Sequence, residues 1–329
     1  MMLSAPEIAS EPVSRCPICR ADKAQSMASG FDYELQTCSN RWNFVRCTAC
    51  GHAWLNPRPA IETLNVIYPQ TYYSYNYESV VHPIAARAKQ WLDRLKFRSI
   101  LAAAAQRPRS YLDVGCGTGR FLKLMEREGI ERSALYGLEL AAEPVRELAQ
   151  QGYQTYCERV ETCSRIAPAS LDLITMFHVI EHVDAPSQTV KKLAEWLTPG
   201  GVLAIETPNL DSLDARLFRG GYWGGYHIPR HWQMFTPESL KRLLEDAGLE
   251  LTAIVYQTGH SFWMYSFHHL LKYHLGLPRL AKLFDPFGGV LPLLAMFTAV
   301  DKLRASTGFR TSAMLALARK PQTRASASH

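Results

Sequence analysis

Short apolar runs alternate with amphipathic stretches over the last two thirds of the chain, which predicts a repeated strand–helix order. The runs predict strands over 111–114, 135–140, 153–157, 171–177, 202–206, 249–256 and 312–318. Apolar residues at helical spacing predict helices over 84–106, 119–128, 143–151, 187–197 and 236–248. Because helices that connect parallel strands cover both faces of a sheet, the pattern predicts an α/β fold with a mostly parallel sheet.

The composition is that of an ordinary globular protein. Apolar residues make up 47% and charged residues 20% of the 329 residues, which excludes global disorder. The longest apolar run, 287–300, contains Pro292 and is shorter than the about 20 residues that cross a bilayer. The N-terminal residues have no apolar core, so we expect no signal peptide and a cytoplasmic protein with reduced cysteines.

The chain divides into the following parts: a tail (1–14), a cysteine-containing module (15–58), a connector with a helix (59–108), the strand–helix region (109–321) and a second tail (322–329). Residues 260–310 form a hydrophobic insertion before the last predicted strand. This insertion contains six Lys or Arg and two Asp. Its net charge is therefore +4 (6 − 2), which is most of the net charge of +6 of the whole chain. Basic and aromatic helices of this kind suit a membrane surface or a lid over an apolar acceptor, and a dimer face or extra core layer is the alternative.

A glycine-rich loop follows the first predicted strand of the sheet. The loop reads Asp113-Val114-Gly115-Cys116-Gly117-Thr118-Gly119 and precedes a helix, so the backbone can approach a ligand closely there. Glu139 ends the next strand, where an acid accepts hydrogen bonds from ribose hydroxyls. This order predicts a nucleoside-binding site, with an ordinary glycine turn as the alternative.

The loop is similar to the first motif of class I S-adenosylmethionine-dependent methyltransferases, and Glu139 matches the ribose-binding acid of that family. Residues 171–183 resemble the fourth strand and following loop of quinone O-methyltransferases and their bacterial relatives. Pro199-Gly200-Gly201 fits the turn before the fifth strand. The resemblance covers about 109–258 and 311–321, and it implies a seven-stranded Rossmann-like sheet whose last strand is antiparallel.

The same resemblance implies which residues bind S-adenosylmethionine. Asp113 would support the methionine end, and the loop glycines would make room for the cofactor. Phe177 would lie near the transferable methyl group, and Val160 and Glu161 fall where the family contacts adenine. The implied cofactor-binding residues are Asp113, Gly115, Cys116, Gly117, Gly119, Glu139, Val160, Glu161 and Phe177.

Histidines after the fourth and fifth strands are candidates for a general base. Methyl transfer needs an aligned nucleophile, and an alcohol or phenol also gains from a base. His178 follows one strand, and His227 and His231 lie in the glycine- and aromatic-rich loop 220–232 after the other. We expect catalytic roles for these three histidines at the carboxyl ends of the strands and contact between the loop and the acceptor. A packed loop whose histidines bond to backbone carbonyls is the alternative.

Two Cys-x-x-Cys pairs, Cys16/Cys19 and Cys47/Cys50, resemble the knuckles of a zinc ribbon. Four thiolates suit tetrahedral zinc, so we expect a structural zinc ion on these cysteines. Cys38 and His52 are substitute ligands. A redox role or free thiols are the alternative, although no thioredoxin-like context is present.

These features predict an S-adenosylmethionine-dependent methyltransferase with a zinc-ribbon-like module. We expect O-methylation of a small molecule, sugar or glycan or lipid-linked intermediate in a bacterial biosynthetic pathway. The alternatives are an RNA methyltransferase with a zinc module and a non-catalytic binding protein on the same scaffold. A nucleic-acid partner is not expected, whereas a homodimer and a peripheral contact with the inner membrane face through 260–310 are further predictions.

Overall fold

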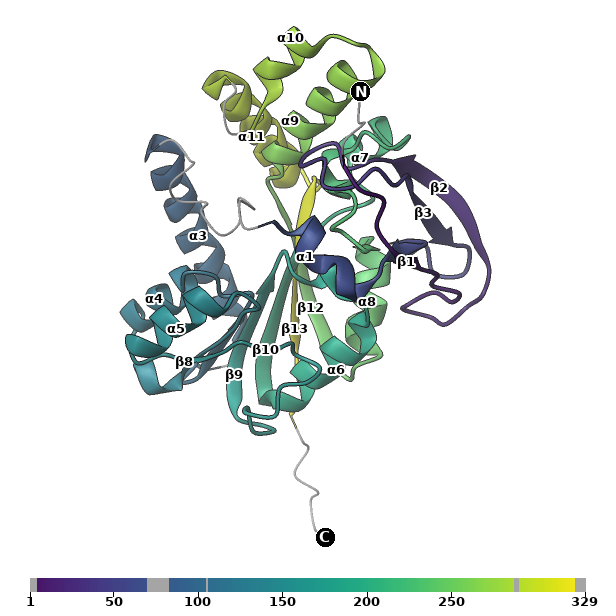
Figure 1. Ribbon diagram of the computed structural model, residues 1–329. Helices are drawn as coiled ribbons and strands as arrows, with labels where there is room; N and C mark the ends of the chain where they lie inside the picture. Colours follow the sequence, from purple (N-terminus) through teal and green to yellow (C-terminus); the bar gives the residue numbers. More distant parts are fainter. Residues whose placement is uncertain (1–4, 70–82, 105, 287–289, 323–329) are drawn as a thin grey trace.

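The computed structural model describes residues 5–69, 83–104, 106–286 and 290–322 (Figure 1). Its central sheet has seven strands in the order β12-β13-β10-β9-β6-β7-β8. These strands are β6 (Tyr111–Val114), β7 (Leu135–Leu138), β8 (Gln154–Tyr156), β9 (Leu171–Phe177), β10 (Leu197–Pro208), β12 (Glu250–Gln257) and β13 (Ala313–Arg319). Strand β13 is antiparallel to both neighbours, and β10, β9, β6, β7 and β8 are mutually parallel. The predicted Rossmann-like sheet with an antiparallel last strand is therefore confirmed.

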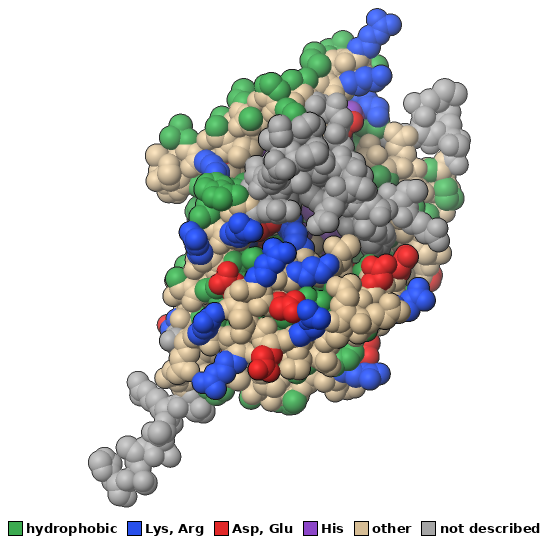
Figure 2. Space-filling model, turned by 90° about the vertical axis from the view of Figure 1, so that its left-hand side faces the viewer, with side chains coloured by type: hydrophobic (Ala, Val, Ile, Leu, Met, Phe, Trp, Pro, Cys, Tyr) green, Lys and Arg blue, Asp and Glu red, His purple; other side chains and the backbone are tan. Residues whose placement is uncertain are grey.

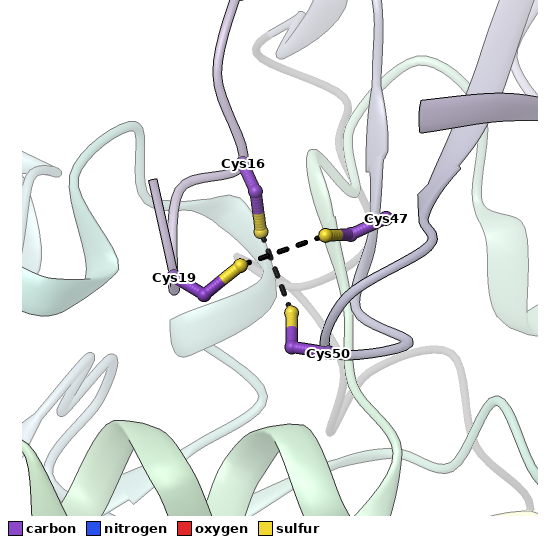
Figure 3. A group of neighbouring side chains, drawn as sticks. All are labelled: Cys16, Cys19, Cys47 and Cys50. Carbon is purple, nitrogen blue, oxygen red and sulfur yellow. Dashed lines mark hydrogen bonds between the residues drawn. The ribbon is translucent and has the colours of Figure 1, made fainter. Parts of the chain in front are cut away.

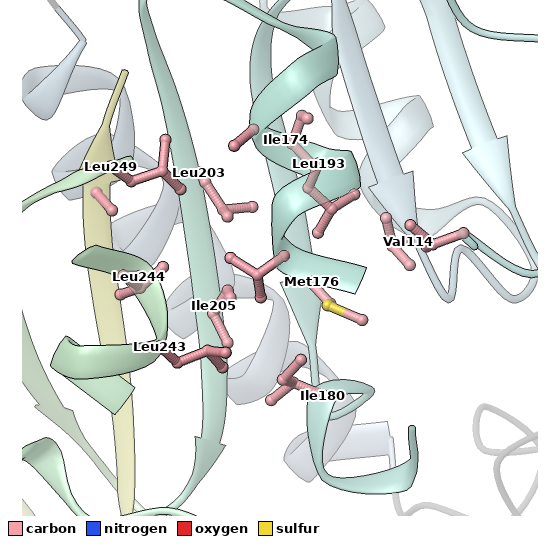
Figure 4. Packing of buried hydrophobic residues seen from close by; sticks show 14 of the residues in the cluster. Val114, Ile174, Met176, Ile180, Leu193, Leu203, Ile205, Leu243, Leu244 and Leu249 are labelled. Atoms are coloured by element: carbon pink, nitrogen blue, oxygen red, sulfur yellow. The ribbon is translucent and has the colours of Figure 1, made fainter. Parts of the chain in front are cut away.

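Helices cover both faces of this sheet (Figure 1). On one face lie α3 (Pro83–Ala103), α4 (Arg120–Arg127) and α5 (Ala142–Gln150); on the other lie α6 (Pro186–Trp196) and α8 (Pro237–Glu245). Successive strand residues point to opposite faces, so Leu173 joins the core under α3–α5 and Ile174 joins the core under α6 and α8. Figure 4 shows the second core, where Leu193 and Leu243 lie among the side chains of the sheet. The two-sided burial explains the continuous apolar runs in the sequence.

Two local expectations differ from the structure. Strand β10 begins at Leu197, which already pairs with Leu171, and the ladder then shifts register before Val202. Residues 198–201 therefore form an irregularity inside the strand rather than a loop before it. Trp91 is among the apolar residues whose helical spacing predicts the helix over 84–106, but it is 54% exposed on α3, whereas Phe97 and Ile100 are buried.

The N-terminal module forms a four-stranded sheet in the order β11-β4-β3-β2. Its strands are β2 (Ala24–Gly30), β3 (Trp42–Cys47), β4 (Ala53–Leu55) and β11 (Gln233–Met234), and a second small sheet pairs β1 (Ser10–Glu11) with β5 (Arg58–Pro59). Strand β11 comes from the chain that follows β10, so the module and the central region share a sheet. The short helices η1 (Ile61–Thr63) and α1 (Leu64–Ile67) follow the module, and residues 70–82 of the predicted connector lie outside the described residues.

The remaining helices lie in the connections and in the insertion between β12 and β13. In the connections these are η3 (Arg132–Ala134), η4 (Ile180–His182), α7 (Leu213–Leu217) and η5 (Gly224–Tyr226). The insertion contains α9 (His260–His269), a π-helical turn (Leu270–His274), α10 (Pro278–Ala281), η7 (Lys282–Phe284) and α11 (Leu291–Ser306). The predicted helical insertion is confirmed. Among the described residues, no helix has the length and hydropathy needed to cross a membrane.

Candidate active site

The glycine loop joins the end of β6 to α4, and its three glycines differ in what surrounds them. All three have positive φ, between 49° and 79°, where a side chain is strained. A Cβ on Gly115 would lie 2.5 Å from Val179, and a Cβ on Gly119 would lie 2.4 Å from Leu148. Around Gly117, no described atom lies within 4 Å of the Cβ position. Packing of the protein itself therefore requires two of the glycines, whereas Gly117 faces open space.

Two acids belong to this part of the site: Asp113 precedes the glycines on the loop, and Glu139 bonds to the loop. Glu139 accepts hydrogen bonds from the backbone N–H groups of Gly117 (3.0 Å) and Leu140 (2.7 Å), so it ties the loop to the end of β7. Asp113 is 2% exposed, and its Oδ1 accepts a hydrogen bond of 2.9 Å from Thr175. Its Oδ2 is buried without a hydrogen-bond partner among the described residues, and burial raises the pKa of Asp113 to about 7.

These observations fit the cofactor that the sequence resemblance implies. The open position at Gly117 and the unpartnered buried oxygen of Asp113 leave space and a polar acceptor on the same loop. Glu139 is half-buried at the adjacent strand end, and each of its oxygens has a second lone pair. The residues present therefore suit an adenosyl group with an amino-acid end.

The other implied cofactor residues have partners within the protein. Cys116 is buried against Gly137, and Phe177 packs against the rings of Phe97 and Phe121. Val160 is buried in the core, and the Glu161 carboxylate accepts a hydrogen bond from Thr189 and pairs with Arg159 at 3.3 Å. Their roles toward the cofactor stay predictions.

His178 directly follows β9 and is the exposed member of the three candidate histidines, with 45% of its side chain accessible. Its Nδ1 is 3.2 Å from Oε1 of Glu181, and its Nε2 is 3.6 Å from Oε1 of Glu206. Burial opposes protonation, but the contacts with Glu181 and then Glu206 raise the pKa of His178 to about 9. Glu206 is also paired with Lys96 of α3. The Nε2 nitrogen is beyond hydrogen-bond distance from Glu206, so it is available to a third group.

His227 and His231 lie deeper, with side chains 6% and 7% exposed. The Nδ1 of His227 is 2.7 Å from Oε2 of Glu34, and the Nδ1 of His231 is 2.8 Å from the carbonyl oxygen of Gly225. His231 also lies 4.0 Å from Glu181 through its Nε2, and burial holds its pKa far below the ordinary value. The structure brings all three histidines to one end of the sheet, but only His178 faces solvent.

A cluster of possible metal ligands lies among these side chains. Atoms of Glu181, His182 and His231 come within 4.8 Å of one another, in a geometry open to a metal ion. Each side chain also has a partner in the protein: Glu181 accepts from Thr207, and His182 lies 2.9 Å from the hydroxyl of Tyr68. We therefore infer that these three side chains have a structural role, in which their hydrogen bonds hold the site together.

The loop 220–232 is packed against the N-terminal module. Arg230 is fully buried and bonds both oxygens of Asp32, at 3.0 and 2.9 Å, in a bidentate pair. Trp223 and Tyr226 are each 1% exposed. The buried side chains of loop 220–232 therefore favour the alternative prediction, a packed loop, whereas contact between the loop and an acceptor stays a prediction.

Four charged residues that shape this site were not predicted from the sequence. They are Asp32, Glu34, Lys96 and Glu206, of which the first three lie more than 100 positions from their partners. Glu206 alone had a sequence signal, because it ends a predicted strand beside His178. The others depend on how the module and α3 dock, which no local motif encodes.

The four cysteines of the two Cys-x-x-Cys pairs converge on one point, as Figure 3 shows. The Sγ atoms of Cys16 and Cys50 are 3.6 Å apart, and those of Cys19 and Cys47 are 3.5 Å apart. Tetrahedral zinc with Zn–S bonds of about 2.3 Å separates its sulfur ligands by about 3.8 Å, whereas a disulfide bond measures about 2.0 Å. The geometry fits a metal ion. Cys38 and His52 are not in the cluster, and the Nε2 of His52 lies 2.9 Å from Oε1 of Gln233.

The strand order, the glycine loop and the acid at the end of β7 define the core of a class I S-adenosylmethionine-dependent methyltransferase. A family model described as a methyltransferase domain matches residues 84–254, which is more than half of the chain. The protein therefore belongs to the methyltransferase domain family.

The chain is also similar to enzymes named ubiquinone biosynthesis O-methyltransferase. The relative from Idiomarina loihiensis is 31% identical over 156 residues, which are 44% of this chain and 62% of the relative. The relative from Azoarcus sp. is 32% identical over 152 residues, which are 44% of this chain and 65% of the relative. The chain thus spans less than two thirds of these curated relatives. A solved methyltransferase from Archaeoglobus fulgidus has a TM-score of 0.45 at 20% identity, over 70% of this chain and 93% of that one.

Proposed function

We propose that the protein is an S-adenosylmethionine-dependent methyltransferase that methylates an oxygen atom of a small molecule, a sugar, or a glycan or lipid-linked intermediate. The observation that carries the proposal is the open position at Gly117, in a loop that bonds to Glu139 and that also holds Asp113, whose Oδ2 has no hydrogen-bond partner among the described residues. The similarity to ubiquinone biosynthesis O-methyltransferases supports an oxygen acceptor.

The bound cofactor supplies an already activated sulfonium methyl group, so the protein residues need only bind, orient and deprotonate. Gly117 leaves the space, Glu139 offers acceptor oxygens for ribose hydroxyls, and Asp113 offers one for a donor at the methionine end. The backbone N–H groups at the start of α4 add partial positive charge beside the loop.

We assign the contact with the acceptor to His178. Its Nδ1 is held by Glu181, and above the pKa of about 9 its Nε2, which lies 3.6 Å from Glu206, can accept the proton of an acceptor hydroxyl. The two neighbouring carboxylates favour the protonated ring, so they stabilise the charge that develops when His178 takes the proton. His227 and His231 are positioning residues behind it, with His227 paired to Glu34 and His231 beside Glu181.

Calorimetry with S-adenosylmethionine tests the proposal directly. The full-length protein should bind it, and Gly117→Arg should abolish binding because the arginine side chain fills the open position. Circular dichroism checks that the variant is folded. A folded wild-type protein without measurable affinity for S-adenosylmethionine would favour a non-catalytic binding protein over the enzyme.

The acceptor class needs its own assay. Transfer of a labelled methyl group to hydroxylated aromatics, sugars and lipid-linked glycans, with ribosomal RNA as a further substrate, separates the proposal from RNA methylation. His178→Ala should lower turnover at least about 100-fold while the affinity for S-adenosylmethionine stays within about twofold. Labelled RNA without labelled small molecules would overturn the assignment.

The module is proposed to hold a structural zinc ion on Cys16, Cys19, Cys47 and Cys50. Four thiolates leave no open coordination position for catalysis. The hydroxyl of Ser187 at the start of α6 bonds to the carbonyl oxygen of Pro17, so the knuckle also contacts the central region. A zinc ion here would stabilise the N-terminal module, whose Glu34 pairs with His227 and whose Asp32 pairs with Arg230.

A further inference from the structure

Exposed apolar side chains are concentrated at one end of the molecule. The described residues include 15 large apolar side chains with high exposure, and 10 of them lie between residues 275 and 309. They are Leu275, Leu277, Leu280, Leu283, Val290, Leu291, Met296, Val300, Leu303 and Phe309. We call this surface the α10–α11 face. Figure 2 shows hydrophobic side chains along the upper edge of the molecule, where these helices lie.

The packing of one side of α11 against the insertion keeps the apolar residues of its other side exposed. Met296, Val300 and Leu303 are 46%, 39% and 68% exposed, and their spacing of three and four residues places them on one side of the helix. On the other side, Phe297 stacks on Trp263 with ring centroids 5.5 Å apart, and Asp301 is 1% exposed.

Asp301 anchors the helix to the rest of the insertion. One carboxylate oxygen accepts a hydrogen bond of 2.8 Å from the backbone N–H of Gly259, and the other accepts one of 3.2 Å from the indole of Trp263. Rotating α11 to bury its apolar side would break both bonds and leave a carboxylate unpaired. The outward apolar surface is therefore a built feature of the fold.

Basic side chains accompany the apolar ones. Arg279, Lys282 and Lys302 are exposed, and among the described residues none of them forms an ion pair with a carboxylate. Lys302 lies 5.0 Å from the ring of Trp91, an exposed aromatic side chain on α3. Exposed leucines, a tryptophan and unpaired cations on one surface are typical of helices that lie in a membrane interface.

We propose that the α10–α11 face binds the surface of a membrane that contains anionic lipids. The apolar side chains would enter the boundary between headgroups and acyl chains, and the three basic side chains would meet the negative headgroups. A second copy of the same face is a poorer partner, because a symmetric contact brings like charges together. This proposal is independent of the methyltransferase assignment. The insertion also contacts the candidate site through another helix, because the ring of Phe262 of α9 lies 6.4 Å from that of His178.

Vesicle flotation of the full-length protein tests the proposal. The protein should float with vesicles of phosphatidylcholine and phosphatidylglycerol, float poorly with phosphatidylcholine alone, and dissociate as NaCl rises from about 0.1 M to about 0.5 M. Met296→Glu/Leu303→Glu should weaken binding more than about tenfold, because it places charges in the apolar boundary. Lys302→Gln should weaken binding about fivefold, the effect of one interfacial charge.

A control lies outside the insertion. Leu140 follows β7 and is 63% exposed, so Leu140→Glu should leave vesicle binding unchanged. Equal binding of wild type and Met296→Glu/Leu303→Glu, or no wild-type binding to anionic vesicles, would overturn the proposal. Sedimentation velocity completes the test: a wild-type dimer that this double variant converts to a monomer would assign the face to a second copy instead.

Discussion

Replacing Glu206 by glutamine tests the electrostatic origin of the proposed base. Glu206 Oε1 lies 3.6 Å from Nε2 of His178, while Glu181 holds the other ring nitrogen at 3.2 Å. Glutamine keeps the size of the side chain and removes its charge. Because Lys96 then loses its carboxylate partner next to the ring, the change should lower the pKa of His178.

The size of the effect follows from the distance. Two unit charges 3.6 Å apart interact by about 1.2 kcal/mol in a water-like dielectric and by about 4.6 kcal/mol at an effective dielectric constant of about 20. These limits correspond to about 0.8 and about 3.4 pKa units. The pKa of His178 stands at about 9 although burial opposes protonation, and two carboxylates share the increase. We expect Glu206→Gln to lower it by about 1 to 2 units, within these limits.

NMR titration of the His178 ring measures this shift without knowledge of the acceptor. In an activity assay, the base is unprotonated only above its pKa, so the rising limb of the rate against pH should lie near pH 9 and move to lower pH in Glu206→Gln. Lys96→Met is the matched control of opposite sign, because loss of the cation should raise the pKa of His178. A wild-type ring that titrates near its ordinary pKa, or one that neither variant changes, would refute the reasoning.

Further variants test the glycine loop, the cysteine cluster and the buried Asp32–Arg230 pair. Gly117→Ala should cost about 1 kcal/mol of unfolding free energy and weaken S-adenosylmethionine binding, whereas Gly119→Ala should mainly destabilise the fold, by more than that, in urea denaturation. Cys47→Ser should release zinc in mass spectrometry while Cys38→Ser retains it; equal metal content would exclude the proposed ligand set. Asp32→Asn should cost about 3–5 kcal/mol because its arginine partner stays buried. The same pair depresses the pKa of Asp32 to about 2, so wild-type stability should fall as the pH drops from about 4 to about 2; a pH-independent unfolding free energy over this range would contradict the ion pair.

The sequence alone determined the strands of the central sheet and the glycine loop of the candidate cofactor site. Strand β9 was predicted at its observed bounds, because two-sided burial makes its apolar run continuous. The start of α8 was also predicted, at residue 236, because the Thr236 side chain caps the helix locally by accepting a hydrogen bond from the backbone N–H of Ser239. The glycine loop and Glu139 were found for the same reason: their contacts are between neighbouring elements.

Only the tertiary structure decided which histidine meets solvent and what surrounds it. The exposure of His178, its contact with Glu206 and the burial of Arg230 against Asp32 depend on contacts between residues distant in the chain. The open position of Gly117, against the packed positions of Gly115 and Gly119, is equally invisible in a motif that contains all three. Local propensity and periodicity encode elements, whereas burial and charge pairing follow from how those elements dock.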